Sequence, residues 1–133
     1  MRPILGAVPV LLLPLIAFAA APPWTIVPTT QTTLAVSSDE VRTIQYRVTN
    51  QSRKPQRLEM KAISGIAQRT DGGGLCDRVF ALQSRQSCLL TLEVDGGRLT
   101  GPVSGGPAVC AEGNPAHCYQ PQSAGALDIT RRP

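Results

Sequence analysis

The sequence predicts an all-β domain, and three observations support this. Several short runs alternate between apolar and polar side chains, as strands do, and no long segment repeats apolar residues at helical spacing. Twelve prolines and twelve glycines punctuate the chain at the spacing expected of turns between short strands. Four cysteines, an even number, favour a small domain stabilised by two disulfides.

Seven segments are expected to form the strands. The third has the clearest signal, because Ile44, Tyr46 and Val48 alternate with polar residues and should share a buried face. The seventh precedes a charged tail and is expected at a sheet edge. About seven short strands are typical of a small immunoglobulin-like β-sandwich. In chain order the predicted strands are residues 24–27, 33–36, 40–49, 56–63, 80–82, 88–94 and 127–130.

The third and fourth predicted strands are expected to pair as a hairpin, because only the polar turn 50–55 separates them. Period-two alternation places Leu58, Met60 and Ala62 of the fourth strand on the inward face. The same alternation in the sixth strand directs Cys88 toward the core, which suits a disulfide.

The stretches between these strands are expected to be loops. Residues 64–75 contain three consecutive glycines, and 101–106 is rich in glycine and proline. Two segments, 67–75 and 98–109, are longer than turns require. They are the candidate interaction surfaces, since long loops on a rigid scaffold often carry recognition. The alternative is that they only cover the ends of the core.

The beginning of the chain has the layout of a secretory signal peptide. Arg2 supplies a positive start, residues 4–18 are uncharged and mostly apolar, and a small-x-small motif ends at Ala19. Cleavage is therefore expected between Ala19 and Ala20. A transmembrane anchor is the alternative, but three prolines interrupt the apolar stretch and no basic cluster follows it.

The mature chain, residues 20–133, is long enough for one domain and hardly for two. An exported chain folds under oxidising conditions, so the protein is expected to be periplasmic or secreted. No cysteine lies near the cleavage site, which disfavours a lipoprotein anchor. No stable membrane insertion is expected after cleavage.

Cys76, Cys88, Cys110 and Cys118 are predicted to form two disulfides, for which three pairings are possible. We favour Cys76–Cys88 and Cys110–Cys118, because each pair is close in sequence and encloses its own turn. The alternative is a metal site that uses Cys110, His117 and Cys118. Adjacent His117 and Cys118 can hardly both face one tetrahedral ion, and the spacing of structural zinc cysteines is absent, so no metal is expected.

The chain carries a formal net charge of +4, from 13 basic and 9 acidic side chains. The basic residues are spread out, apart from clusters at 53–57 and 131–132. One Trp, two Tyr and two Phe provide few stacking surfaces, so a nucleic-acid partner is not expected. An ordinary solvated surface explains this charge, and weak attraction to an anionic membrane or glycan is the alternative.

The sequence predicts no enzyme, because residues for a catalytic set are scarce. His117 is the only histidine and adjoins a cysteine expected to be bridged. Nucleophile-elbow and phosphate-loop motifs are absent. The carboxylate pairs Asp39-Glu40 and Glu93/Asp95 lie at strand ends, where solvated charge is the usual explanation, and no calcium-loop pattern accompanies them. No cofactor is expected.

Asn50-Gln51-Ser52 matches the N-glycosylation pattern. The pattern lies in a predicted turn, so it should be accessible. The simpler explanation is that Asn and Ser are good turn residues. The arginine-rich composition and short leader suggest a bacterial source, in which the pattern usually has no meaning.

Several segments resemble known exported bacterial domains. The runs Tyr46–Ser52 and Cys88–Val94 have the forms Y-x-V-x-N-x-S and C-x-L-x-L-x-V. They resemble immunoglobulin-like domains related to the MSP and ASPM/SPD-2/Hydin group. Residues 60–66, 105–110 and 118–121 are similar to segments of small secreted proteins of unassigned function from Legionella-type Gram-negative bacteria. The resemblance implies a sandwich fold and export, and it implies no catalytic residues.

Together these observations predict an exported, non-enzymatic binding or structural module of the bacterial cell envelope, with an unidentified protein or envelope component as its partner. It would act by surface recognition or by strand addition at an exposed sheet edge. One alternative is a secreted, host-directed factor that binds a eukaryotic surface. A less favoured one is a small hydrolase or metal-dependent enzyme built around His117.

Overall fold

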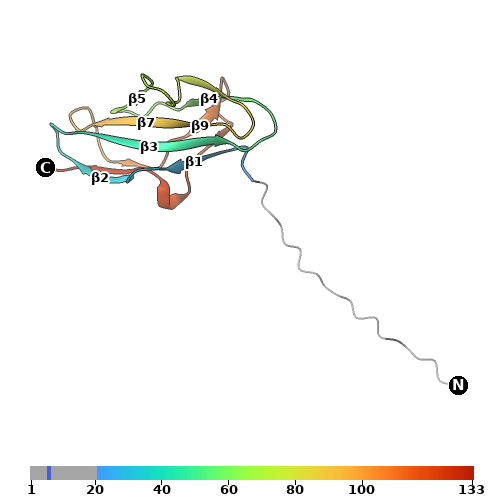
Figure 1. Ribbon diagram of the computed structural model, residues 1–133. Helices are drawn as coiled ribbons and strands as arrows, with labels where there is room; N and C mark the ends of the chain where they lie inside the picture. Colours follow the sequence, from blue (N-terminus) through green and yellow to red (C-terminus); the bar gives the residue numbers. More distant parts are fainter. Residues whose placement is uncertain (1–5, 7–20) are drawn as a thin grey trace.

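The computed structural model describes Gly6 and residues 21–133 (Figure 1). The predicted signal peptide and its cleavage between Ala19 and Ala20 lie outside the described residues. The described part contains eleven strands and one short 3-10 helix, η1 (Ser123–Gly125). The strands are β1 (Trp24–Pro28), β2 (Thr33–Val36), β3 (Val41–Asn50), β4 (Gln56–Met60), β5 (Ile66–Arg69), β6 (Val79–Leu82), β7 (Ser87–Asp95), β8 (Val103–Ser104), β9 (Val109–Ala111), β10 (Cys118–Tyr119) and β11 (Asp128–Arg131).

These strands form three sheets within the described part of the chain. The first has the order β1-β3-β7-β5 and is antiparallel throughout, with β3 and β7 running side by side (Figure 1). The second has the order β10-β9-β4-β6 and is also antiparallel. In the third, β11 lies between β2, to which it is parallel, and β8, to which it is antiparallel.

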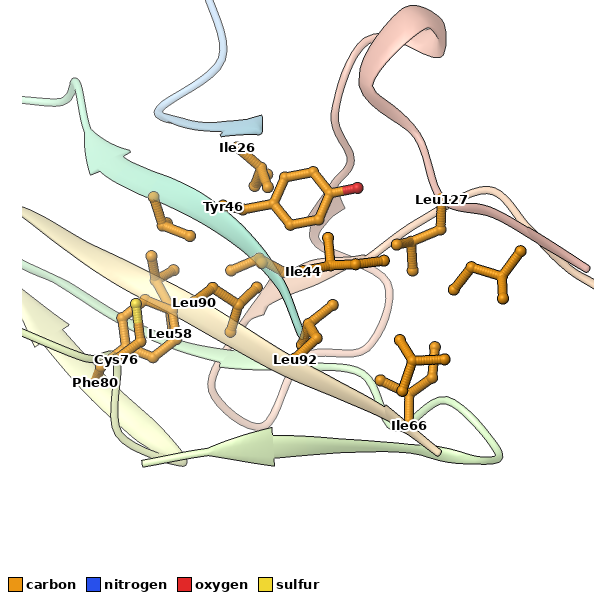
Figure 2. Close-up of a cluster of buried hydrophobic side chains, with 14 of the residues drawn as sticks. Ile26, Ile44, Tyr46, Leu58, Ile66, Cys76, Phe80, Leu90, Leu92 and Leu127 are labelled. Atoms are coloured by element: carbon orange, nitrogen blue, oxygen red, sulfur yellow. The ribbon is translucent and has the colours of Figure 1, made fainter. Parts of the chain in front are cut away.

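One hydrophobic core joins the buried faces of the three sheets (Figure 2). In β3, Ile44, Tyr46 and Val48 are fully buried, which confirms the prediction from their alternation. The second and third sheets contribute Leu58 of β4 and Ile129 of β11, which are also fully buried. Buried side chains of all three sheets therefore belong to one hydrophobic cluster.

The predicted hairpin between the third and fourth strands is wrong. β3 pairs with β1 and β7, whereas β4 pairs with β6 and β9. The turn 50–55 therefore carries the chain from the first sheet to the second. The fully buried side chain of Asn50 accounts for this, because its Nδ2 donates to the carbonyl oxygens of Lys54 and Leu82 at 2.8 and 2.9 Å. These bonds tie the turn to β6 of the second sheet.

Four further predictions differ from the structure. Residues 64–75 are not all loop, because β5 lies among them and packs Ile66 into the core. The predicted loop 101–106 likewise contains β8. The fourth strand ends at Met60, so Ala62 is exposed and does not point inward. The last strand, β11, is central and not at an edge, since both of its sides are paired.

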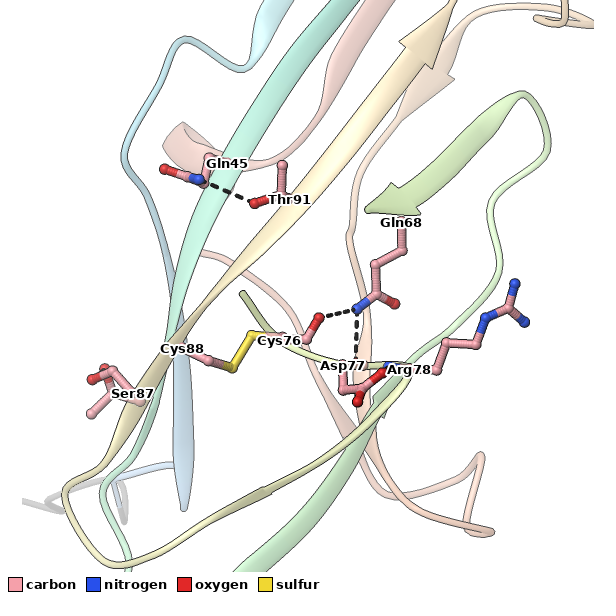
Figure 3. The surroundings of a disulfide bond; sticks show 9 residues. Gln45, Gln68, Cys76, Asp77, Arg78, Ser87, Cys88 and Thr91 are labelled. Atoms are coloured by element: carbon pink, nitrogen blue, oxygen red, sulfur yellow. Dashed lines mark hydrogen bonds between the residues drawn. A yellow bond between two sulfur atoms is a disulfide. The ribbon is translucent and has the colours of Figure 1, made fainter. Parts of the chain in front are cut away.

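Both predicted disulfides are confirmed. Cys110 and Cys118 lie opposite each other in the pairing of β9 with β10. Cys76 joins the segment before β6 to Cys88 of β7 (Figure 3), and Cys88 is partly buried against the core. Two disulfides are typical of proteins that fold in an oxidising environment outside the cytoplasm. Within the described residues, no helix has the length and apolar character needed to cross a bilayer.

Candidate functional site

A groove of about 430 Å³ follows the outer edge of β1. β1 is an edge strand of the first sheet and pairs only with β3. Residues at β10 and in the segment around η1 form the other side of the groove, so it opens where two parts of the domain meet at their margins. The lining residues are Pro22, Trp24, Thr25, Ile26, Val27, Pro28, Tyr119, Gln120, Gln122, Ala124 and Gly125.

Main-chain groups of β1 lie along this groove without a partner strand. The amide of Thr29 donates to the carbonyl oxygen of Gln45 at 2.9 Å, so the odd-numbered residues of this segment bond to β3. Because antiparallel strands alternate, Trp24 and Ile26 direct their N–H and C=O groups away from β3. No loop hydrogen bond within residues 21–133 reaches the main chain of either residue. Two donors and two acceptors on this side of β1 therefore have no main-chain partner, although both residues are buried, with exposed fractions of 0% and 4%.

Prolines lie in the sequence on both sides of the unpaired residues of β1. Pro22 and Pro23 precede β1, and Pro28 is its last residue. Proline has no N–H and is common on edge strands, where it discourages unwanted pairing with other chains. The interruption leaves only Trp24 and Ile26 able to extend the ladder. A strand that added here would therefore form a short ladder.

The side chain of Trp24 fixes β1 against the second sheet. It is fully buried, and its Nε1 donates to the carbonyl oxygen of Val109 in β9 at 3.0 Å. The rings of His117 and Tyr119 each lie 5.0 Å from its ring, measured between centroids. Tilted and edge-on aromatic pairs contribute roughly 1 kcal/mol each beyond the area they bury. This cluster makes the inner side of the groove rigid.

The wall that contains η1 is held from the core. The hydroxyl of Tyr46 donates to the carbonyl oxygen of Gly125 at 2.7 Å. Burial raises the pKa of Tyr46, so the hydroxyl remains protonated and able to donate. Gly125 also packs so closely on Pro28 that an added Cβ would lie 2.9 Å from the proline Cδ. In the same wall Gln122 and Ala124 are exposed to the groove.

At the opposite edge of the first sheet, residues 74–77 continue the line of β5 along β7. Next to β5, Nε2 of Gln68 donates to the carbonyl oxygens of Cys76 and Asp77 at 3.1 and 2.9 Å (Figure 3). The disulfide to Cys88 and a 2.9 Å bond from the Cys76 amide to the Leu89 carbonyl hold this segment against β7. The other edge strand of this sheet, β1, lies beside the groove of about 430 Å³.

The two loops predicted as interaction surfaces meet only near their first residues. Ala67 and Arg98 line a smaller pocket of about 240 Å³ together with Glu93 and Asp95. Asp95 pairs with Arg98 at 3.5 Å, and Glu93 pairs with Arg69 at 3.1 Å. Each carboxylate of this predicted pair thus has an arginine partner, and ion pairs at the surface account for both.

The other predicted carboxylate pair stabilises the turn before β3. Oε1 of Glu40 accepts hydrogen bonds from the Ser37 amide at 3.1 Å and from Arg132 at 2.9 Å. The first of these bonds and then the second lower the pKa of Glu40. Oδ1 of Asp39 accepts a bond from the Ser37 hydroxyl at 2.9 Å. These contacts join the turn to the C-terminal end of the chain.

The other candidate site residues named from the sequence, His117 and Asn50, contact neighbouring protein groups. His117 is exposed, and its ring contacts the two aromatic rings beside it. Among the described residues, no three His, Cys, Asp or Glu side chains are grouped to hold a metal ion. The predicted accessibility of the glycosylation pattern is wrong, because Asn50 is fully buried and its Nδ2 donates two hydrogen bonds.

No protein-family model matches this chain, and no significant match to a curated protein was found. The candidate site therefore depends on geometry. The groove was not among the sequence predictions, although a signal for it exists. The only tryptophan of the chain stands in a short strand with proline on both sides, a pattern that indicates an edge strand with one well-packed anchor.

Proposed function

We propose that this protein is an exported, non-enzymatic binding module of the bacterial cell envelope that takes up an extended peptide segment along β1. The fold that presents β1 is proposed to be an immunoglobulin-like sandwich in which the two four-stranded sheets enclose the core. The observation that carries the proposal is the set of unpaired main-chain groups of Trp24 and Ile26 directly beside a groove. Because both residues are buried, an added strand would first displace the side chains that now cover them.

Strand addition explains why main-chain and groove features occur together. Once uncovered, the unpaired N–H and C=O groups of Trp24 and Ile26 would extend the antiparallel ladder, which gives affinity that is independent of the peptide's sequence. Alternate side chains of the added strand would enter the groove and contact Tyr119 and the η1 wall, which gives specificity. The prolines keep the ladder short, so side-chain contacts carry a large share of the binding energy.

The lining of the groove indicates the chemistry of the peptide. None of its eleven lining residues is charged, whereas aromatic, proline and glutamine side chains are present. A charged side chain in the groove would lose hydration without gaining a counter-charge, which is unfavourable. We therefore expect an uncharged segment in which apolar and amide side chains predominate.

Filling the groove with a larger side chain tests this proposal. Ala124 is exposed and lines the groove, whereas its neighbour Ser123 is equally exposed and does not line it. Ala124→Trp and Ser123→Trp therefore form a matched pair. Linear peptides are selected from a random display library on the oxidised wild-type protein, and their affinities are measured on both variants. The exchange rate of the Ile26 amide is followed by NMR with and without peptide.

The expected peptides bind Ala124→Trp about tenfold or more weakly and bind Ser123→Trp as they bind the wild type. The Ile26 amide becomes protected from exchange when peptide is bound. Equal affinity for the two variants, an unprotected Ile26 amide, or a selection that enriches no peptide would each contradict the proposal. Release of the protein into the medium instead of retention in the periplasm would favour the host-directed role over the envelope role.

A further inference from the structure

Two turns meet at the end of the domain where β3 finishes. The turn 50–54 receives a hydrogen bond from the Arg85 amide to the Asn50 carbonyl oxygen at 2.8 Å. The Ser84 hydroxyl donates to the Ser52 carbonyl oxygen at 2.7 Å. These bonds hold the turn 83–86 against the turn 50–54 although about thirty residues separate them in sequence.

Three basic side chains occupy these turns, and we call them the basic end: Arg53, Lys54 and Arg85. All three are exposed. None of the six ion pairs found among residues 21–133 includes any of them. Nearby Arg57 differs, since its Nε pairs with Glu112 at 2.6 Å. The basic end is therefore a group of charges without counter-charges from the protein.

The chain keeps acidic residues away from this end. No Asp or Glu occurs before Asp39, between Glu40 and Glu59, or between Asp77 and Glu93. The start of β1 and both turns of the basic end belong to these three acid-free stretches. At the opposite end of β3, carboxylates and arginines alternate and pair. The domain is thus electrostatically asymmetric along the direction of β3.

Arg85 provides a second, independent observation. Its φ is 69°, in the left-handed region that non-glycine residues seldom adopt. Glycine, or asparagine next, would suit that conformation better. Residues held in such conformations concentrate at functional sites. The basic end thus includes an arginine in a conformation that this residue type seldom adopts.

The predicted signal peptide leads into the same end. Trp24, at the start of β1, is the register partner of Asn50, and the Gln51 amide donates to the Pro23 carbonyl oxygen at 2.8 Å. Phe18, the last residue of the predicted apolar stretch, is six residues before Trp24. That length of chain spans roughly 20 Å at most. A leader anchored in a bilayer would therefore keep the start of β1, next to the basic end, within about that distance of the membrane surface.

From this placement we propose that the basic end is an electrostatic docking surface for a membrane that carries anionic phospholipids. It binds headgroups without insertion, because the side chains concerned are charged and exposed. Each basic residue near an anionic bilayer favours binding by about fivefold, so three favour it on the order of a hundredfold. The groove along β1 lacks charged residues, so this docking does not depend on peptide binding there.

Two triple variants test the proposal. They have the same net charge as each other, because each replaces three basic residues by glutamine. The first is Arg53→Gln, Lys54→Gln and Arg85→Gln. The control is Lys61→Gln, Arg78→Gln and Arg131→Gln, which removes three exposed basic residues that also have no ion pair among the described residues. Lys61 lies five residues beyond Gln56 along β4 and its end, roughly 16 Å away. That is about two Debye lengths at physiological salt.

The exported, oxidised protein and both variants are mixed with phosphatidylcholine vesicles that either contain or lack phosphatidylglycerol, and bound protein is measured by sedimentation. We expect binding to the anionic vesicles that weakens as salt is added. The basic-end variant loses this binding on the order of a hundredfold, and the control loses less than about threefold. A signal peptide that stayed attached would contribute equally to all three proteins.

Two results would overturn the proposal. Equal losses in the two triple variants would show that net charge alone causes binding. Equal binding of the wild type to anionic and neutral vesicles would show that headgroup charge is not recognised. Thermal unfolding of the variants confirms that both remain folded, as expected for substitutions of exposed side chains. Since the groove has no role here, the result is independent of any peptide selection.

Discussion

The hydroxyl of Tyr46 in β3 donates a 2.7 Å hydrogen bond to the carbonyl oxygen of Gly125 in η1, across 79 residues of sequence. It connects the centre of the hydrophobic core to the wall of the groove. η1 is only three residues long and has no side-chain cap hydrogen bond, so it depends on such contacts for its position. The shape of the proposed peptide site is thus linked to a residue that no peptide would touch.

Tyr46→Phe is expected to lower the free energy of unfolding by about 1–2 kcal/mol. The variant keeps the buried ring and leaves the Gly125 carbonyl oxygen without its donor. Urea unfolding followed by the fluorescence of Trp24 measures the change. Tyr119→Phe is the control, because Tyr119 is only partly buried and its hydroxyl has no hydrogen-bond partner among the described residues. A loss of the same size in both variants would show that the Tyr46 hydroxyl has no special role.

Asn50→Ala is expected to destabilise the protein by about 2–4 kcal/mol. The substitution removes the donors to Lys54 and Leu82 and the acceptor for the Ser52 amide and hydroxyl; the bond to Leu82 is buried and the others are partly buried. Gln51→Ala, at the exposed neighbouring position, should change stability by less than about 0.5 kcal/mol. Chemical denaturation of the two variants makes the comparison. Similar stability of both would contradict the role given to Asn50 in directing the chain between sheets.

Asn50 also shows where sequence reasoning stops. Alternation in β3 predicted the buried face correctly, because the pleat directs every second side chain to one side whichever strands lie beside it. The alternation could not predict which strands pair with β3. A six-residue polar turn serves equally well for a hairpin and for a crossing to another sheet. The bond from Asn50 to Leu82, 32 residues away, decides between them.

The candidate site was less predictable than the fold. Trp24 and Tyr119 are 95 positions apart, and their contact follows from the pairing of β10 with β9. The basic end likewise combines Arg53 and Lys54, a visible cluster, with Arg85, which looks isolated in the sequence. Disulfides were the exception, because nearby cysteines in a chain expected to be exported leave few plausible pairings.

Replacing Cys76 and Cys88 together by serine is expected to lower the free energy of unfolding by roughly 3 kcal/mol, since the bridge closes a loop with a sequence separation of 12. Residues 74–77, which continue the line of β5 along β7, also lose their covalent tie to β7. We therefore expect faster amide exchange in β5 than in β1 when the variant is compared with the wild type. Unchanged exchange in β5, measured by NMR, would show that the disulfide is not needed and that the hydrogen bonds of Gln68 hold residues 76–77 in place.

Stability is expected to decrease in acid partly through Glu112. A hydrogen bond from Arg57 lowers the pKa of Glu112 in the folded protein. Because the folded pKa lies below the unfolded one, this stabilisation is present above about pH 4.3 and is lost as the pH falls through the lower, folded pKa. Glu112→Gln and Arg57→Gln should each make the free energy of unfolding decrease less as the pH falls below about 4.3. Urea unfolding at several pH values measures this dependence. An unaltered pH profile in both variants would show that the pair does not contribute.

Gly96→Ala is expected to destabilise the protein by about 3 kcal/mol through a main-chain clash. An added Cβ would lie 1.8 Å from the carbonyl oxygen of Ser37, and the Gly96 amide already donates to the Glu40 carbonyl oxygen at 2.9 Å. Neither contact can relax without moving the turn before β3, and overpacking of this kind is costly. Gly101→Ala is the matched control, because its Cβ would enter open space and its backbone is not left-handed. Thermal unfolding compares the two, and equal melting temperatures would show that the turn moves aside without loss.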